Sequence, residues 1–140
     1  GARVGYAVAD PSLTEFLEVV RPPFNVNLIG EAAALGALED PDFLTDAQTR
    51  LGIERAEIVA SLARLQGLRP LPSETSLLFV DVSGTGWTST QLVEALARRG
   101  VLVTDCRSYA GLEHRDFIRI SLGRPDDNRR FLRSLEAILG

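Results

Sequence analysis

The sequence predicts an α/β or α+β domain, and three observations lead to this class. The 140 residues are 45% apolar and 24% charged, with a mean hydropathy of +0.06, which is the balance of an ordinary globular domain. Short runs rich in β-branched and aromatic residues alternate with segments of helical periodicity. No internal repeat or low-complexity linker separates these segments, so the composition marks no second domain.

The first forty residues predict one strand and two helices. Residues 3–9 are rich in β-branched and aromatic side chains and stop at Asp10-Pro11, which favours a buried strand. Asp10 can accept a hydrogen bond from a free amide of the next helix, predicted over 12–20, and Pro11 suits its first turn. Two prolines end this helix. The run 28–38 is small and apolar on nearly all sides, so it predicts a helix packed closely against other structure.

The remaining hundred residues begin with a long helix and then alternate. Asp40-Pro41 repeats the cap-and-proline signal and opens a helix to about Gln66, which Gly67 ends. Strands are expected at 77–82, 101–104 and 117–122, and helices at 89–98 and 126–139. Thr88 and Gln91 match a capping box at the start of the first of these helices. Residues 83–86, Ser-Gly-Thr-Gly, predict a plain strand-to-helix turn, because they lack the lysine of a phosphate loop and the glycine spacing of a dinucleotide site.

Residue counts exclude several classes of chemistry. The net charge of −4 argues against nucleic acid as a partner. One cysteine and one histidine cannot form an intrachain disulfide or a Cys/His metal site. All fifteen basic residues are arginine, so no side chain of this chain can form a Schiff base as lysine does. No apolar run has the length of a membrane span, and residues 1–10 lack the basic, apolar and cleavage regions typical of a signal peptide, so we expect a cytoplasmic protein. Gly1 opens directly into an apolar run, so we also expect a piece of a longer protein.

Three conspicuous side chains have simple structural interpretations. His114 lies between Glu113 and Arg115, in a polar segment typical of a solvated loop. Cys106 closely follows a predicted strand and is interpreted as a buried structural thiol. Trp87 follows a turn and is interpreted as a packing anchor.

Two arginines leave an open question. Arg119 lies inside the apolar run 116–122, where alternation puts it on the same face as Phe117 and Ser121. A guanidinium in such a strand needs an anionic partner, either a bound carboxylate or one of the nineteen acidic side chains of the chain. Arg3 raises the same question near Gly1 and Gly5, where spacing alone favours a surface arginine.

The order of segments resembles the C-terminal portion of the fold type I pyridoxal-phosphate-dependent aminotransferases, in the branch of histidinol-phosphate aminotransferase and threonine-phosphate decarboxylase. The resemblance covers essentially the whole chain and rests on six stretches in family order. They are GARVGYAVA at 1–9, RPPFNVN at 21–27, LPS at 71–73 before LLFV at 77–80, GVLV at 100–103, DC at 105–106 and IRISLG at 118–123.

The resemblance implies a mixed sheet packed with helices, pyridoxal 5'-phosphate as cofactor and a homodimer. It implies that residues 1–40 form the end of a large domain with a connecting helix, and that 41–140 form a small domain. Arg3 matches the family arginine that binds the cofactor phosphate, and Arg119 matches the one that grips the substrate α-carboxylate. The Schiff-base lysine of the family motif would lie about six residues before Gly1. The implied activity is transfer of an amino group between an amino acid, or an amino alcohol phosphate, and a 2-oxo acid in amino-acid biosynthesis. The isolated chain is then expected to be inactive.

Two departures and two alternatives remain open. Ser76 and Leu77 stand where the family run has Asn and Phe, and Thr104 stands where many relatives carry an arginine that helps to bind a phosphorylated side chain. Arg107 is either a replacement for that arginine or a surface residue. The chain is alternatively a non-catalytic module that binds an amino acid through Arg119, or a degenerate relative retained as a partner for another chain.

Overall fold

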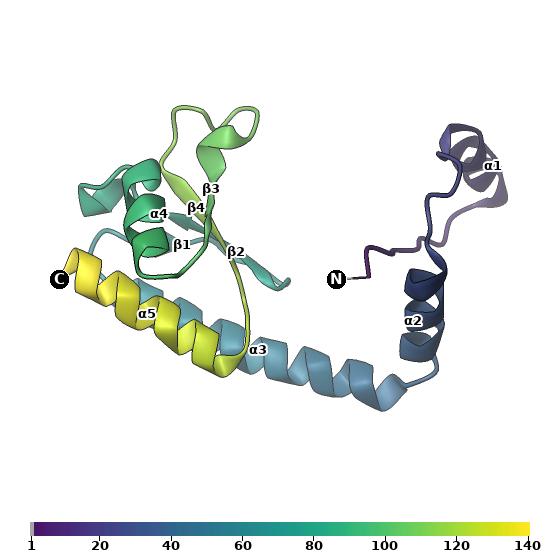
Figure 1. The fold of residues 1–140 in the computed structure, drawn as a ribbon, viewed down its shortest axis with the longest axis horizontal. Coiled ribbons are helices and arrows are strands. Elements are labelled where there is room, and N and C mark those ends of the chain that lie inside the picture. The colour runs from purple at the N-terminus through teal and green to yellow at the C-terminus, as the bar shows by residue number, and fades with distance from the viewer. Residues whose placement is uncertain (1) are drawn as a thin grey trace. The chain divides into compact units, whose positions relative to one another are not determined.

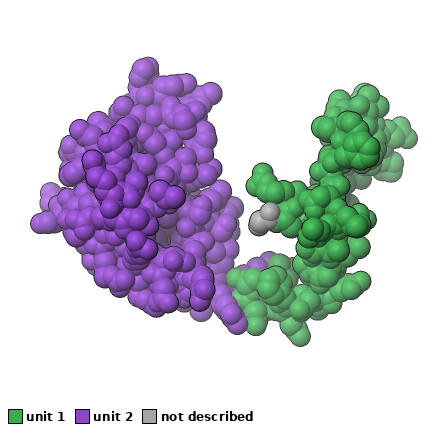
Figure 2. Space-filling model, in the orientation of Figure 1, with its two compact units in different colours: residues 1–47 green, residues 48–140 purple. Residues whose placement is uncertain are grey.

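The computed structural model describes residues 2–140, and the chain forms two compact units, unit 1 (1–47) and unit 2 (48–140) (Figure 2). The boundary falls inside the continuous helix α3 (Pro41–Arg64). Because the two units are joined by a helix and not by a linker rich in Pro or Gly, the amino-acid composition does not reveal the boundary. None of the helices within residues 2–140 is long and apolar enough to cross a membrane.

Unit 1 contains α1 (Pro11–Val20), α2 (Leu28–Leu38) and the start of α3 (Figure 1). The Asp10 carboxylate accepts a hydrogen bond from the Ser12 amide at 2.9 Å, as predicted for the cap of α1. The Asn27 side chain caps α2 by accepting from the Gly30 amide at 2.7 Å. Both predicted helices are confirmed. A Cβ on Gly30 would lie 3.0 Å from the Ala2 carbonyl oxygen, which is the close approach expected of this small-residue helix.

The strand predicted over 3–9 is wrong. Residues 2–10 form no helix or strand and are exposed. A strand exists only when a neighbouring strand accepts and donates its backbone hydrogen bonds, and no strand within residues 2–140 pairs with this segment. The β-branched residues of this segment favour a strand, but a strand forms only where another strand is available to pair with it.

Unit 2 is a four-stranded sheet with three helices. The strands are β1 (Arg69–Pro70), β2 (Leu77–Asp81), β3 (Thr104–Asp105) and β4 (Phe117–Ser121), in the order β1-β2-β4-β3. The rest of α3, α4 (Ser89–Arg98) and α5 (Pro125–Leu139) complete the unit, with short 3₁₀ turns η1 (Ser83–Thr85) and η2 (Cys106–Ser108). The capping box at Thr88 and Gln91 is present. The α/β class is therefore confirmed.

The sheet is antiparallel between all hydrogen-bonded neighbours of the described chain, which corrects the expected mixed sheet. The strand-helix-strand connection through α4 does make β2 and β3 run in the same direction, since both are antiparallel to β4. However, β4 lies between them, so the two parallel strands never pair.

The strand predicted over 101–104 is shorter than expected and begins only at Thr104. The reason is the end of α4. Gly100 adopts a left-handed φ of 72° and donates its amide to the Ala97 carbonyl, and the Val101 amide donates to Leu96 at 3.0 Å. These bonds close the helix terminus and keep the Val101 amide from the sheet. Leu102 is consequently 86% exposed.

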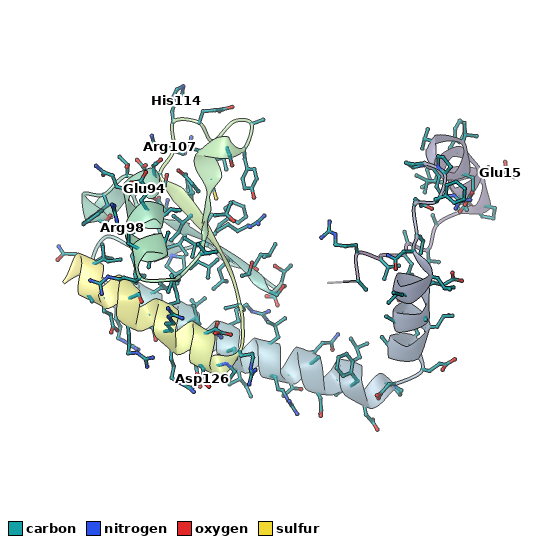
Figure 3. The ribbon with its side chains drawn as sticks, in the orientation of Figure 1. Glu15, Glu94, Arg98, Arg107, His114 and Asp126 are labelled. Carbon is teal, nitrogen blue, oxygen red and sulfur yellow. The ribbon has the colours of Figure 1, made fainter. Side chains whose placement is uncertain are left out.

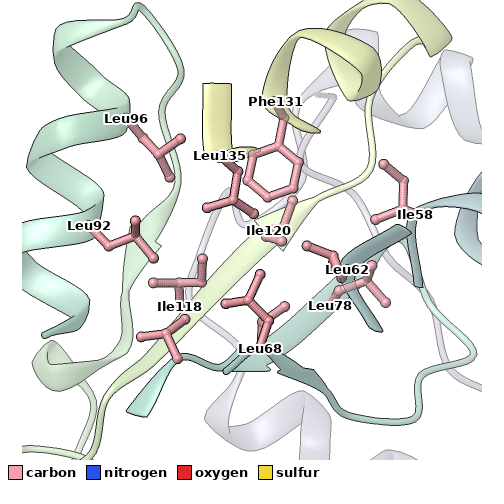
Figure 4. Packing of buried hydrophobic residues seen from close by; sticks show 12 residues of the cluster. Ile58, Leu62, Leu68, Leu78, Leu92, Leu96, Ile118, Ile120, Phe131 and Leu135 are labelled. Carbon is pink, nitrogen blue, oxygen red and sulfur yellow. The ribbon is translucent and has the colours of Figure 1, made fainter. Parts of the chain in front are cut away.

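The hydrophobic core lies between one face of the sheet and the three helices (Figure 4). Alternate residues of β2 and β4, such as Leu78 and Ile118, point to this face. Leu62 of α3, Leu96 of α4 and Leu135 of α5 pack against them, and each is fully buried. On the opposite face of the sheet the residues of β2 and β4 are all at least partly exposed, and this open face carries the candidate site.

Candidate functional site

Arg119 lies at the centre of this open face. It occupies the middle of β4, with Phe79 of β2 directly opposite on one side and Thr104 of β3 on the other. Its neighbours in β4, Ile118 and Ile120, point into the core. Strand alternation therefore places Arg119 on the same face as Phe117 and Ser121, as the sequence predicts.

The guanidinium of Arg119 has two neutral neighbours. Its Nη2 donates to the Thr104 hydroxyl at 3.3 Å, and its Cζ lies 5.7 Å from the centre of the Tyr109 ring. Its Nε is buried and has no acceptor within residues 2–140. None of the ion pairs found among those residues involves Arg119. Of the two partners that the sequence allows, the intrachain acid is thus not observed, and a half-buried charge is left for an anionic ligand.

A hydrogen-bonded network holds the segment that carries Tyr109. Asp105 accepts from the Arg107 amide at 3.0 Å and so caps η2. The same carboxylate accepts from the hydroxyls of Ser89 at 2.8 Å and Thr90 at 2.6 Å, at the start of α4. Asp116, just before β4, accepts from the Arg107 guanidinium at 2.8 Å.

The pKa shifts in this network follow from its contacts. Burial alone would raise the pKa of Asp105, but the bonds from Thr90, the Arg107 amide and Ser89 outweigh it and hold the pKa below its ordinary value. Burial raises the pKa of the Cys106 thiol, and the negative charge of Asp105 raises it further. Cys106 is fully buried, consistent with its interpretation as a structural thiol.

Arg3 belongs to unit 1 and has different surroundings. Its side chain is exposed, its backbone has a φ of 58°, and no ion pair within residues 2–140 involves it. The adjacent Ala2 carbonyl accepts a hydrogen bond from the Asn27 side chain at 3.2 Å, which joins this segment to the start of α2. A free guanidinium fork of this kind suits the oxygens of a phosphate.

The remaining candidates have structural roles. His114 is exposed on the loop before β4 (Figure 3). Trp87 packs against the edge of the core, and residues 83–86 form a 3₁₀ turn that ends at Gly86 with a φ of 80°. In the part of the chain that the structure describes, no group of three His, Cys, Asp or Glu side chains is placed to hold a metal ion.

Sequence reasoning missed Tyr109, Asp105 and Asp116 as parts of the site. Tyr109 contacts Arg119 across ten residues of chain, and Asp105 reaches Thr90 across fifteen. Helix and strand periodicity does not predict contacts between residues that are separated by a loop of this kind. The signal available was the polar cluster Thr88-Ser89-Thr90, whose hydroxyls exceed what a capping box needs.

Comparison with known proteins gives a consistent picture. A model of the family described as aminotransferase class I and II matches residues 1–135. The histidinol-phosphate aminotransferase of Methanopyrus kandleri is 39% identical over 140 residues, which are 99% of this chain and 35% of that protein. The histidinol-phosphate aminotransferase of Symbiobacterium thermophilum is also 39% identical, over 100% of this chain and 37% of its own length. The chain thus spans little more than a third of these relatives.

Solved structures show the same fold. The L-threonine-O-3-phosphate decarboxylase from Porphyromonas gingivalis superposes with a TM-score of 0.74 at 25% identity, over 94% of this chain and 40% of that one. The histidinol-phosphate aminotransferase from Sinorhizobium meliloti, solved in complex with pyridoxal-5'-phosphate, gives a TM-score of 0.73 at 26% identity, over 92% of this chain and 34% of that one.

Proposed function

The chain belongs to the class I and II aminotransferases, and we propose that it is the C-terminal portion of a pyridoxal-phosphate-dependent enzyme similar to histidinol-phosphate aminotransferase. The complete protein transfers an amino group between an amino acid, or an amino alcohol phosphate, and a 2-oxo acid. The observation that carries the proposal is Arg119, a half-buried guanidinium on an open sheet face with no acidic partner among residues 2–140.

The role of Arg119 is to bind and orient the substrate carboxylate. Its guanidinium is planar and matches the two oxygens of a carboxylate, so binding fixes the direction of the substrate as well as its position. A substrate held at one end presents its α-carbon in one orientation to the reacting groups, which favours reaction without any proton transfer by Arg119 itself.

The residues present also fit an anionic cofactor at Arg3. Its exposed, unpaired guanidinium would hold the phosphate of pyridoxal 5'-phosphate, and Asn27 fixes the neighbouring backbone. When bound, this cofactor withdraws electrons from the substrate α-carbon. The 140 residues contain no lysine, so the proposal assigns the Schiff-base lysine to the remainder of the complete protein. This chain then contributes binding and orientation rather than acid-base chemistry.

The substrate side chain is constrained by two residues near Arg119. Thr104 offers a neutral hydroxyl, and that hydroxyl accepts from Arg119. Arg107 is paired with Asp116 at 2.8 Å, so we assign Arg107 a structural role and not the binding of a side-chain phosphate. A phosphorylated substrate would need its second cation from another part of the complete protein.

Other parts of the proposal follow from the resemblance. They are a homodimeric complete protein, a cytoplasmic location and the division of this chain into the end of a large domain (1–40) and a small domain (41–140). The second candidate function is a non-catalytic module that binds an amino acid. It is favoured by one observation, which is that unit 2 has its own hydrophobic core beside Arg119.

Two preparations separate these functions. The 140-residue chain and the full-length protein that contains it are each mixed with pyridoxal 5'-phosphate, an amino donor and a 2-oxo acid, and keto-acid production and cofactor absorbance are followed. We expect turnover by the full-length protein and none by the chain. Turnover by the 140-residue chain, or none by a folded full-length protein with any amino donor tested, would overturn the proposal.

The same measurement tests Arg119 directly. Because charge-assisted hydrogen bonds contribute about 1.5–3 kcal/mol each, Arg119→Leu should raise the KM for carboxylate substrates on the order of 100-fold. Arg124→Leu, at an exposed position just before α5, is a matched control that should leave the KM unchanged. Tight amino-acid binding by the isolated chain that Arg119→Leu abolishes would instead support the non-catalytic module.

A further inference from the structure

The orientation of Arg119 depends on side chains that lie beside it on the open face. A free arginine side chain samples many rotamers, and ordering it during binding reduces affinity. In this structure the Thr104 hydroxyl accepts from Nη2 at 3.3 Å, while the Tyr109 ring lies under Cζ at 5.7 Å. A separation below about 6 Å between a guanidinium and an aromatic ring is attractive, more so when water is partly excluded.

Tyr109 is itself held at both backbone groups. Its amide donates to the Cys106 carbonyl at 3.0 Å, and its carbonyl accepts from the Leu112 amide at 3.0 Å. It directly follows η2, whose first turn is capped by Asp105. The ring therefore extends from a defined turn and not from a loose loop.

The turn is anchored to the rest of unit 2 at both ends. Asp105 accepts from Ser89 and Thr90 of α4, and at the other end of the loop Asp116 accepts from the Ser89 amide at 2.8 Å. Arg107 joins the two ends through its bond to Asp116. With these contacts in place, displacement of the Tyr109 backbone away from Arg119 requires the breaking of several charged hydrogen bonds.

We infer that Tyr109 is a positioning residue for the substrate carboxylate. Its ring holds the Arg119 guanidinium against the sheet while Thr104 accepts one N–H, so the other N–H groups face a carboxylate in a fixed orientation. The inference rests on the proposed function, since it requires that Arg119 binds that carboxylate. Tyr109 does not touch the substrate in this arrangement; it acts through Arg119.

The test uses the full-length protein with bound pyridoxal 5'-phosphate and 2-oxoglutarate as the carboxylate probe, with binding measured by calorimetry. Tyr109→Leu removes the aromatic face and should raise the Kd about 5- to 10-fold. Tyr109→Phe keeps the ring and should stay within about 2-fold of the parent protein. In steady-state kinetics the KM should rise with little change in kcat, because the lost interaction holds the carboxylate before and during reaction alike. Cofactor affinity, measured by absorbance, should not change.

The outcomes distinguish the inference from the proposed function. If Arg119→Leu weakens 2-oxoglutarate binding and Tyr109→Leu does not, the inference fails and the proposed function stands. If Arg119→Leu has no effect, the proposed role of Arg119 fails as well. Equal weakening by the Phe and Leu variants would assign the effect to the hydroxyl and overturn the role of the ring. A parallel loss of cofactor affinity would show a general structural defect and also overturn it. Should Tyr109→Leu not fold, Tyr109→Gln takes its place with the same expected result.

Discussion

The helices α1 and α2 of unit 1 are more apolar than α4 and α5 of unit 2, yet they are far less buried. In unit 1 Gly30 is the one buried residue of positions 2–47, and large apolar side chains such as Phe16 and Ile29 are exposed. In unit 2 twelve buried apolar residues form one core. Helices of about ten residues are marginal in water without tertiary packing, so α1 and α2 need contacts that unit 1 does not supply. Hydrophobic composition therefore predicts that a helix is packed, but not which part of a protein packs it.

The two units also differ in net charge. Unit 1 has eight acidic residues and two arginines, whereas unit 2 has eleven acidic residues and thirteen arginines. The net charge of −4 is therefore the sum of a strongly acidic unit 1 and a mildly basic unit 2. Both arginines proposed to bind anions remain unpaired among residues 2–140, one in each unit. Unit 2 thus combines a core of its own with the proposed carboxylate site, and unit 1 carries the proposed phosphate contact.

The sharpest test of this difference compares two phenylalanines in the 140-residue chain. Phe131 of α5 is 4% exposed and Phe16 of α1 is 74% exposed. Phe131→Ala should lower the free energy of unfolding by about 3–5 kcal/mol, because it leaves a cavity in the core. Phe16→Ala should change it by less than about 0.5 kcal/mol. Urea denaturation measures both, and equal losses would contradict the assignment of the core to unit 2.

Two glycines give effects of opposite sign. Gly67 has a φ of 83°, and a Cβ there would lie 2.3 Å from the Gly84 carbonyl oxygen, so Gly67→Ala should destabilise by about 2–3 kcal/mol. Gly36 lies inside α2, and a Cβ there meets nothing within 4 Å. Gly36→Ala should stabilise by up to about 1 kcal/mol through helix propensity. Thermal unfolding of both variants decides this, and a stabilising Gly67→Ala would show that the turn is not packed as described.

Asp105 should make the stability of unit 2 depend on pH. Its pKa is lowered in the folded protein, so its contribution is complete above the ordinary aspartate pKa near 3.9 and is lost as the pH falls through the lower folded value. Asp105→Asn should cost about 1 kcal/mol at pH 7, as expected for a lost cap. The difference between parent and variant should shrink below about pH 4. A difference that grows in acid would have the wrong sign for this network.

Exposed ion pairs should contribute little to the free energy of unfolding in either unit. Arg21 and Glu18 pair at 2.8 Å in unit 1, and Arg98 and Glu94 pair at 3.7 Å in unit 2, with all four side chains more than half exposed. Glu18→Gln and Glu94→Gln should each change the free energy of unfolding by less than about 0.5 kcal/mol. Chemical denaturation at low and high salt checks this, and a large effect in either unit would indicate a network not seen here.

The parts of the fold that depend on local chemistry were predictable from the sequence. Helices 28–38 and 89–98 have the predicted bounds, because each end is set by residues next to it in the sequence, with caps at Asn27 and Thr88. The alternation in β4 placed Arg119 on the correct face. The ligands proposed for Arg119 and Arg3 follow from the family resemblance and not from the periodicity of the sequence.

The parts that depend on distant partners were not predictable. Residues 3–9 have strand composition but no strand to pair with in the described chain, and 101–103 are held by the terminus of α4. The insertion of β4 between β2 and β3 is a property of the whole sheet. The contact of Tyr109 with Arg119 arises from a loop whose ends meet through Asp105 and Asp116, and no spacing in the sequence encodes it.

The most direct test of the central claim is a crystal structure of the full-length protein with pyridoxal 5'-phosphate and a 2-oxo acid. The account predicts that two nitrogens of the Arg119 guanidinium lie about 3 Å from the two carboxylate oxygens, with the Tyr109 ring still beneath it. A carboxylate held by another residue, with Arg119 paired to an acidic side chain, would contradict it.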